Sequence, residues 1–82
     1  MKKRVTLVIP GAGEEAEARD GEIEAGDTVA DVLRAADKDP STWRAYLQRS
    51  NGDVSLNAQD DLFAAIVDGE KVFVEPASMV VG

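Results

Sequence analysis

The sequence predicts a small α+β domain in which one main helix packs on a mixed sheet of four to five strands. Runs of β-branched and aliphatic residues near both ends of the chain, 4–9 and 71–75, are typical of strands. Residues 28–38 combine helical spacing with a helix cap, and Asn51-Gly52 between two short apolar runs is typical of a tight hairpin. A chain of 82 residues has room for one modest core, so a single domain is expected.

The first strand is expected at Arg4 to Ile9, in the interior of the sheet, and Pro10-Gly11 ends it. The following stretch, from Gly11 to Gly26, is acidic, and Ile23 is its only large apolar residue. This composition predicts a loop followed by a second, partly exposed strand.

The helix is expected at about 28–38. Thr28 is a natural N-cap, and Asp31 stands three residues later, in the capping-box position. Apolar residues recur at helical spacing and predict a stripe that packs on the sheet: Val29, Val32, Leu33 and Ala36. Asp31, Arg34 and Asp37 then face solvent, and Asp39-Pro40 ends the helix because the residue before proline avoids helical geometry.

Three short strands are expected after the helix, at Trp43 to Arg49, around Val54 to Leu56, and at Lys71 to Glu75. Pro76 ends the last of them, and Trp43 is expected to pack near the end of the helix. The polar stretch 57–61 predicts a turn, whereas the pattern of Leu62 to Val67 leaves its geometry open.

The composition excludes several classes of function. With 9 Lys and Arg against 16 Asp and Glu, the chain carries a charge of −7, which disfavours nucleic acid and anionic membranes as partners. With no Cys and no His, it lacks the residues of zinc sites and of common nucleophilic catalysis, so neither an enzyme nor a cofactor is expected. Asp60-Asp61 and Asp68 lack the spacing of a calcium loop, so no metal is expected. The basic start at 2–4 is too short for a signal peptide, which favours a cytoplasmic protein.

Several stretches resemble ubiquitin-like proteins of the β-grasp fold. Glu22 to Val29 resembles ubiquitin's second strand running into its capped helix, and Asp39-Pro40 falls where ubiquitin's helix-ending prolines lie. Residues 28–40 followed by 43–47 resemble the bacterial multiubiquitin repeats. The pattern of Leu62, Asp68-Gly69-Glu70, Val72 and Pro76 resembles the small sulfur carriers of molybdopterin and thiamine synthesis. The resemblance covers the chain from about Arg4 to Gly82.

The resemblance implies that residues 1–76 form the ubiquitin-like domain and that 77–82 form a flexible tail. In this family an activating enzyme uses ATP to adenylate the C-terminal glycine, here Gly82. The residues implied to enter the partner's channel are Pro76, Ala77, Ser78, Met79, Val80 and Val81. Ubiquitin and the sulfur carriers end in two glycines, whereas this chain ends in Val81-Gly82. That departure favours the bacterial ubiquitin-like proteins that work with activating enzymes, conjugating enzymes and deubiquitinase-like peptidases.

The resemblance also implies a partner-binding surface. Tyr46 falls at the place of the central isoleucine of ubiquitin's recognition patch, and Phe73 falls beside it on the last strand. Strand alternation turns both rings outward, near Arg44, although a small core would equally accept them. The acidic run from Glu14 to Asp27 is either a docking surface for a basic enzyme face or a solvated loop.

Three functions therefore remain. The favoured one is a bacterial ubiquitin-like modifier that an activating enzyme joins to target proteins, with Lys2, Lys3, Lys38 and Lys71 as either chain acceptors or solvating charges. The first alternative is a sulfur carrier with a thiocarboxylate on Gly82. The second is an interaction module that never uses its terminus.

Overall fold

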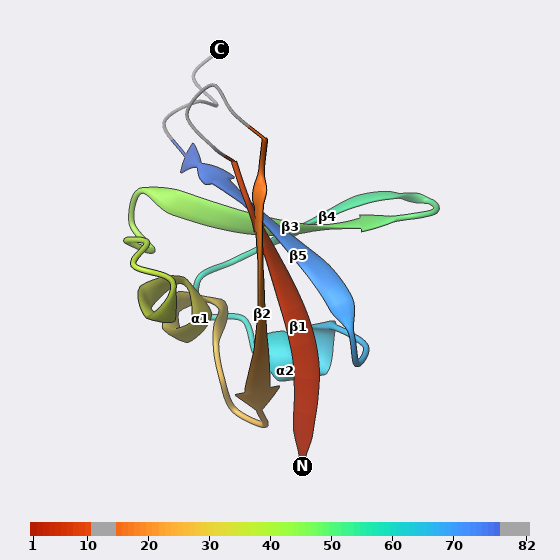
Figure 1. Ribbon diagram of the computed structural model, residues 1–82. Helices are drawn as coiled ribbons and strands as arrows, with labels where there is room; N and C mark the ends of the chain where they lie inside the picture. Colours follow the sequence, from red (N-terminus) through yellow and green to blue (C-terminus); the bar gives the residue numbers. More distant parts are fainter. Residues whose placement is uncertain (11–14, 78–82) are drawn as a thin grey trace.

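The computed structural model describes residues 1–10 and 15–77 and forms one twisted mixed sheet with two helices (Figure 1). The elements in chain order are β1 (Lys2–Ile9), β2 (Glu17–Glu24), α1 (Val29–Ala35), β3 (Trp43–Arg49), β4 (Gly52–Leu56), α2 (Leu62–Ala65) and β5 (Glu70–Pro76). The strands are arranged in the order β2-β1-β5-β3-β4. β1 and β5 are parallel, and the other pairs are antiparallel. The α+β class and the mixed sheet are confirmed.

The first and last strands lie side by side in the middle of the sheet. Val8 of β1 pairs with Phe73 of β5, and β1 also pairs along its whole length with β2. The second pairing extends β1 to Lys2, two residues before the expected start, because Lys2 has a partner in Glu24. The interior position expected for β1 is confirmed.

The cap at the start of α1 forms as expected. Thr28 Oγ1 accepts from the backbone N–H of Asp31 at 3.2 Å, and Asp31 Oδ2 accepts from the backbone N–H of Thr28 at 3.1 Å. The two bonds satisfy two of the backbone donors that have no partner within the helix. The helix buries Val29, Leu33 and Ala36 against the sheet.

The expected end of the helix at residue 38 is wrong. α1 ends at Ala35, and Asp37 adopts a left-handed conformation with φ of 61°. The N–H of Lys38 bonds to the carbonyl of Leu33 at 2.8 Å, and that of Asp37 bonds to the carbonyl of Arg34 at 3.0 Å. These two bonds form a Schellman motif, so the backbone closes the helix before Pro40 has any influence.

Two details follow from local backbone chemistry. The stretch from Leu62 to Val67, for which the sequence predicted no definite structure, contains the short helix α2. Asp61 caps this helix by accepting from the N–H of Ala64 at 3.2 Å. The hairpin between β3 and β4 forms, but its turn is one residue earlier than expected. Arg49 pairs with Gly52, so Ser50 and Asn51 make the turn and Gly52 takes the positive φ of 126°.

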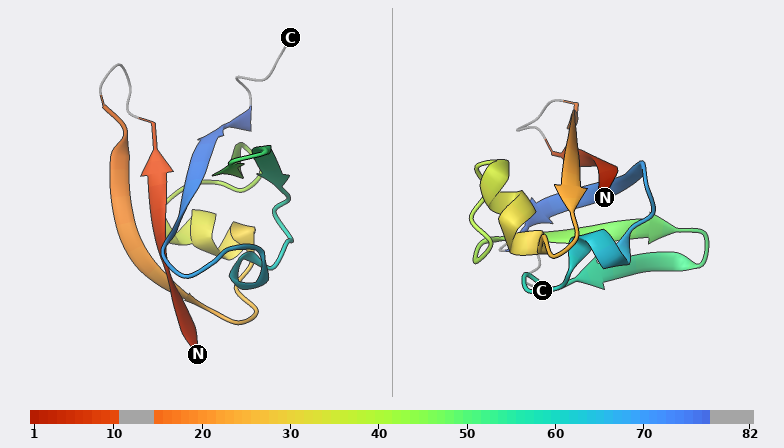
Figure 2. Two further views of the ribbon diagram at one scale, coloured as in Figure 1. Left: turned by 90° about the vertical axis from the view of Figure 1, so that its right-hand side faces the viewer. Right: turned by 90° about the horizontal axis from the view of Figure 1, so that it is seen from below.

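The core lies on the one side of the sheet that α1 and α2 cover (Figure 2). Its buried residues are Val5, Leu7, Ile9, Ile23, Val29, Leu33, Ala36, Ala45, Leu47, Leu62, Ile66, Val72 and Val74. Trp43 packs against this cluster near the end of α1, as expected, and the Lys38 amine lies 4.4 Å from its ring centre. Neither helix covers the other side of the sheet, so the side chains there remain accessible.

Candidate partner-binding surface

The uncovered side of the sheet is called the open face. Its central row follows from the strand register, because Val8 pairs with Phe73 and Phe73 pairs with Tyr46. The same row continues to Ala18 of β2 and Ser55 of β4. Residues directly opposite one another on adjacent strands point to the same side. An apolar strip therefore crosses the three central strands.

The two aromatic rings of this strip stack on each other. The ring centres of Tyr46 and Phe73 are 5.5 Å apart, and the ring planes differ by 22°. Both residues are half-buried, whereas their strand neighbours on the other side, such as Leu47 and Val72, are in the core. The sequence left open whether the two rings point outward or belong to the core. The structure places both rings on the open face.

Arg44 stands beside the rings, at one border of the strip. Its Nε and Nη2 atoms donate to Oε2 of Glu75, at 3.1 and 2.7 Å. A hollow of about 150 Å³ lies next to this pair and is lined by Arg44, Tyr46, Asp53, Ser55 and Glu75. The pair holds both side chains in place and gives the strip a charged border.

The opposite border of the strip is also polar. Lys71 pairs with Thr6 in the register of β1 and β5, and the Thr6 hydroxyl donates to Asp20 at 2.8 Å. Lys71 is exposed and stands two residues before Phe73. An apolar centre with a polar rim is the usual composition of a protein interface.

The start of the expected tail is held in the fold. Pro76 is the last residue of β5 and pairs with Trp43, and Ala77 is half-buried and donates its N–H to the carbonyl of Thr42 at 2.8 Å. The other residues implied to act in a partner's channel lie outside the described residues: Ser78, Met79, Val80, Val81 and Gly82.

The aspartates considered as calcium ligands have local roles. Asp60 Oδ2 accepts from the N–H of Asn57 at 2.8 Å, and Asp61 caps α2. Asp68 Oδ1 accepts from the N–H of Arg4 at 2.7 Å, which holds the pKa of Asp68 below its usual value. Within 1–10 and 15–77, no group of three or more acidic, His or Cys side chains is arranged to hold a metal ion. No helix among these residues is long and apolar enough to cross a membrane.

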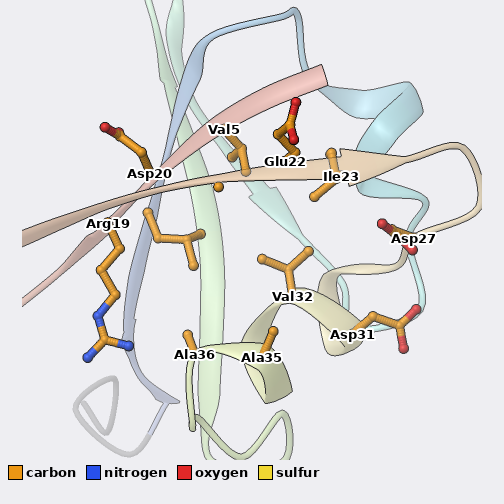
Figure 3. A pocket seen from close by; sticks show the side chains of 12 residues that line it. Val5, Arg19, Asp20, Glu22, Ile23, Asp27, Asp31, Val32, Ala35 and Ala36 are labelled. Carbon is orange, nitrogen blue, oxygen red and sulfur yellow. The ribbon is translucent and has the colours of Figure 1, made fainter. Parts of the chain in front are cut away.

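Sequence reasoning missed a groove between β2 and α1, of about 400 Å³ (Figure 3). The acidic run from Glu14 to Asp27 was expected to be either a docking surface or a loop. Part of it forms β2, in which successive side chains point to opposite sides of the sheet. Asp20 and Glu22 point away from α1, whereas Asp27 lies with Asp31 at one end of the groove (Figure 3). The signal available in the sequence was Gly21, a residue without a side chain inside a strand.

The chain is similar in fold to a solved structure described as a ubiquitin-like protein from the hyperthermophilic archaeon Caldiarchaeum subterraneum. The two share 21% sequence identity with a TM-score of 0.52, and the match covers 96% of this chain and 99% of the other. No protein-family model matches the sequence. No curated protein matches it either. The order of strands, the capped helix on one side of the sheet and this likeness agree, and the chain has the ubiquitin-like β-grasp fold.

Proposed function

We propose that the chain is a bacterial-type ubiquitin-like modifier, which a separate activating enzyme joins to target proteins through Gly82. The observation that carries the proposal is the stacked pair of Tyr46 and Phe73, presented on the uncovered side of a ubiquitin-like fold. The chemistry belongs to the partners, since the chain contains no Cys and no His.

In the proposed reaction, the Gly82 carboxylate attacks the α-phosphorus of ATP on the activating enzyme. An acyl-adenylate forms and pyrophosphate leaves. In the direct route, the amine of a target lysine attacks the acyl carbon of the adenylate, and AMP leaves as the amide forms. In the indirect route, an enzyme thiol attacks first and displaces AMP to give a thioester, and the lysine amine then attacks the thioester and displaces the thiol. Because glycine has no side chain, the acyl carbon stays open to attack.

The geometry of the fold is compatible with a partner enzyme that binds the open face and acts on Gly82. Ala77 is the last described residue, and five residues separate it from the carboxylate, which limits their extended reach to about 17 Å. A partner's active site must therefore approach the end of β5 that carries Pro76. The open face begins at this same end, since Arg44 pairs with Glu75. One enzyme can hold the strip and reach the terminus together.

The four lysines differ in how free their amines are to act as acceptors. Lys3 Nζ donates to the carbonyls of Phe63 and Ile66, at 2.6 and 2.8 Å, and Lys38 lies over the Trp43 ring. Lys2 is 3.9 Å from Glu24, and Lys71 is exposed on the open face. If the modifier forms chains, we expect linkages at Lys2 or Lys71 rather than at Lys3.

The test is denaturing purification of N-terminally tagged protein from its native host, with wild type beside a variant lacking Gly82. Intact-mass and tryptic mass spectrometry are applied to all retained material. We expect covalent adducts joined through Gly82 in the wild type and none in the deletion variant. Unmodified protein in both samples, while the host expresses an activating enzyme, would contradict the proposal.

The same experiment separates the two alternatives. A sulfur carrier shares the adenylate but accepts sulfide in place of the amine, so its mass rises by the exchange of one oxygen for sulfur. An interaction module shows neither change, and its function survives loss of Gly82.

The role of the open face is tested by replacing Tyr46 and Phe73 with alanine. We expect the double variant to lose roughly tenfold or more in affinity for the activating or conjugating enzyme, as for central aromatic residues of interfaces. Val67→Ala is a matched control because Val67 is an exposed apolar residue outside the strip. Equal affinity of the double variant and the wild type would remove the open face from the proposal.

A further inference from the structure

A cleft lies beside the start of β3, and we call it the β3 cleft. Its apolar lining comes from α1, β3 and β4 and from the loops beside them: Val29, Leu33, Pro40, Trp43, Leu56 and Ala58. Its volume is about 300 Å³, at the lower end of the usual range of ligand pockets, roughly 300 to 1,000 Å³. Aliphatic side chains that bind there are removed from water, which favours binding.

The cleft is open because β3 extends past the end of β4. β3 pairs with β5 from Trp43 onward, but its pairing with β4 starts only at Ala45, opposite Leu56. Beyond Leu56 the chain turns toward α1, where the carbonyl of Ala58 accepts from the N–H of Ala30 at 2.8 Å. Within residues 1–10 and 15–77, no strand therefore fills the space beside Trp43 on this side of β3.

The apolar lining of the cleft is only partly covered. Trp43 and Leu56 pack against the core but remain half-buried, and Ala58 is half-buried as well. Among the described lining residues Arg44 alone is charged, and it is already paired with Glu75 at 2.7 Å. A charged occupant would lose its water there without gaining a partner, so the cleft favours an apolar and uncharged one.

The chain itself contains a segment with these properties next to the cleft. β5 ends beside the start of β3 (Figure 1), and Ala77, which follows β5, lines the cleft. Residues 78–82, outside the described part of the chain, continue with the sequence Ser-Met-Val-Val-Gly and have no charged side chain. An extended chain of two residues reaches about 7 Å, and one of four residues about 14 Å, so Met79 and Val81 are both within reach of the cleft.

We propose that the segment from Ser78 to Val81 binds in the β3 cleft as an autoinhibitory contact within the chain. Because Ala77 lines the cleft, Met79 and Val81 of an extended segment share its side, whereas Val80 points away. Met79 and Val81 are then the side chains that the cleft buries. The segment is joined directly to the wall of the cleft, so its effective concentration there is high and a weak contact is sufficient.

The contact controls access to Gly82, and in that respect it rests on the proposed function. An activating enzyme can bind only those chains whose segment has left the cleft, so its apparent affinity is reduced by that fraction. The contact itself is measured on the chain alone. Its absence would leave the proposed function standing, and its presence does not depend on whether Gly82 is ever activated.

Trp43 is the only tryptophan of the chain, so its fluorescence reports on the cleft. The wild type, Met79→Ser and the matched control Val80→Ser are titrated with acrylamide, a neutral quencher. We expect stronger quenching in Met79→Ser, because the ratio of bound to free segment falls roughly tenfold when one aliphatic side chain stays in water. Val80→Ser should be quenched like the wild type. Equal quenching of Met79→Ser and the wild type, or a larger effect of Val80→Ser, would overturn the proposal.

NMR locates the contact. We expect nuclear Overhauser effects (NOEs) from the Met79 methyl group to the Trp43 indole and from the Val81 methyl groups to Leu56. A sample that mixes isotope-labelled with unlabelled chains shows whether these effects arise within one chain, as expected. NOEs between two chains, NOEs to the open face, or none from these methyl groups to the cleft would each contradict the proposal.

The cleft is tested from its other side with two variants of β4. Leu56→Ala removes part of the lining, whereas Val54→Ala shortens a side chain that is 41% exposed and lies outside the lining. We expect only Leu56→Ala to move the Met79 methyl signal toward its position in the free peptide Ser-Met-Val-Val-Gly. An unchanged signal in a folded Leu56→Ala variant, or equal shifts in both variants, would overturn the proposal. Met79→Ser alters no residue of the described fold, so the fluorescence test remains decisive if Leu56→Ala does not fold.

Discussion

The two ends of β5 are held in very different ways. At the Glu70 end, the Glu70 carboxylate accepts two bonds from Arg49, at 2.9 and 3.0 Å, and one from the N–H of Val67. Nearby, the Lys3 amine closes the end of α2. At the Pro76 end, the bond from Ala77 to Thr42 is the last that the described residues provide. Half-buried charged groups therefore hold the Glu70 end, whereas the Pro76 end is held by the exposed pair of Arg44 and Glu75 and by one backbone bond to Thr42.

The largest effect on stability is expected at Leu62, in the helix α2 that the Lys3 amine closes near the Glu70 end of β5. This side chain of α2 is 0% exposed, and truncation to alanine would leave a cavity. We expect Leu62→Ala to lower the free energy of unfolding by about 2 to 5 kcal/mol, which is most of the stability of a domain this small. Urea denaturation measures it. Val67→Ala, at a residue 66% exposed, should change the value by less than about 0.5 kcal/mol.

The next effect is expected at Lys3. Replacing it with methionine keeps the apolar stem but leaves the carbonyls of Phe63 and Ile66 without their donor. We expect a loss of about 1 to 3 kcal/mol in the free energy of unfolding. Lys71→Met is the matched control, since Lys71 is exposed and should tolerate the change. Equal losses for the two variants would show that the Lys3 bonds do not stabilise this end.

Acid should weaken the Glu70 end. Burial alone would raise the pKa of Glu70, but the hydrogen bonds from Arg49 and Val67 outweigh it and lower the pKa. A carboxyl whose pKa is lowered by folding stabilises the folded protein at pH values above the pKa of the same group in the unfolded chain. For Glu that unfolded pKa is about 4.3. That contribution is lost as the pH falls through the lower folded pKa. Asp68 acts in the same direction, because the Arg4 N–H lowers its pKa.

We therefore expect the free energy of unfolding to fall as the pH drops below about 4, with a shallower slope in Glu70→Gln. The variant should also lose about 1 kcal/mol at neutral pH. The control is Glu75→Gln, at the Pro76 end, where the exposed pair with Arg44 should contribute less than about 1 kcal/mol. An unchanged acid slope in Glu70→Gln would assign the acid sensitivity to other groups.

The smallest effect is expected midway along β5, where Phe73 stacks on Tyr46. A double-mutant cycle with Tyr46→Ala and Phe73→Ala should give a coupling of about 0.5 to 1.5 kcal/mol in the free energy of unfolding. Tyr46→Ala combined with Val67→Ala should instead be additive, because Val67 is not part of the stack. Additivity in the first cycle would mean that the two rings are held by the backbone and not by each other.

Local signals in the sequence were sufficient for the start of α1 and for most strands. The cap of Thr28 and Asp31 needs only neighbouring residues, so it was readable, and so was the run from Trp43 to Arg49. The end of α1 was not, because an aspartate at a left-handed position is uncommon and the Asp39-Pro40 signal stood close by. α2 has four residues, which is too few to show helical periodicity.

The candidate surfaces, too, were predicted from the sequence only in part. Alternation along β3 and β5 predicted that Tyr46 and Phe73 share a side, but their direct stacking depends on the register between the two strands, and the two residues are 27 positions apart in sequence. The groove depends on the spacing between β2 and α1, which no local pattern encodes. Gly21 marks its place only once the fold is known, since a glycine in a strand is equally typical of a bulge.

The place of β5 has a consequence for how the protein is made. Among the described residues β5 comes after the other four strands, yet it stands in the middle of the sheet and joins the β1–β2 hairpin to the β3–β4 hairpin. During synthesis these two hairpins emerge first, and no strand joins them until Glu70 to Pro76 has left the ribosome. Isolated hairpins are marginally stable in water, so the domain assembles only after its final strand is released. A nascent chain stalled before Glu70 would expose both halves of the core to proteases.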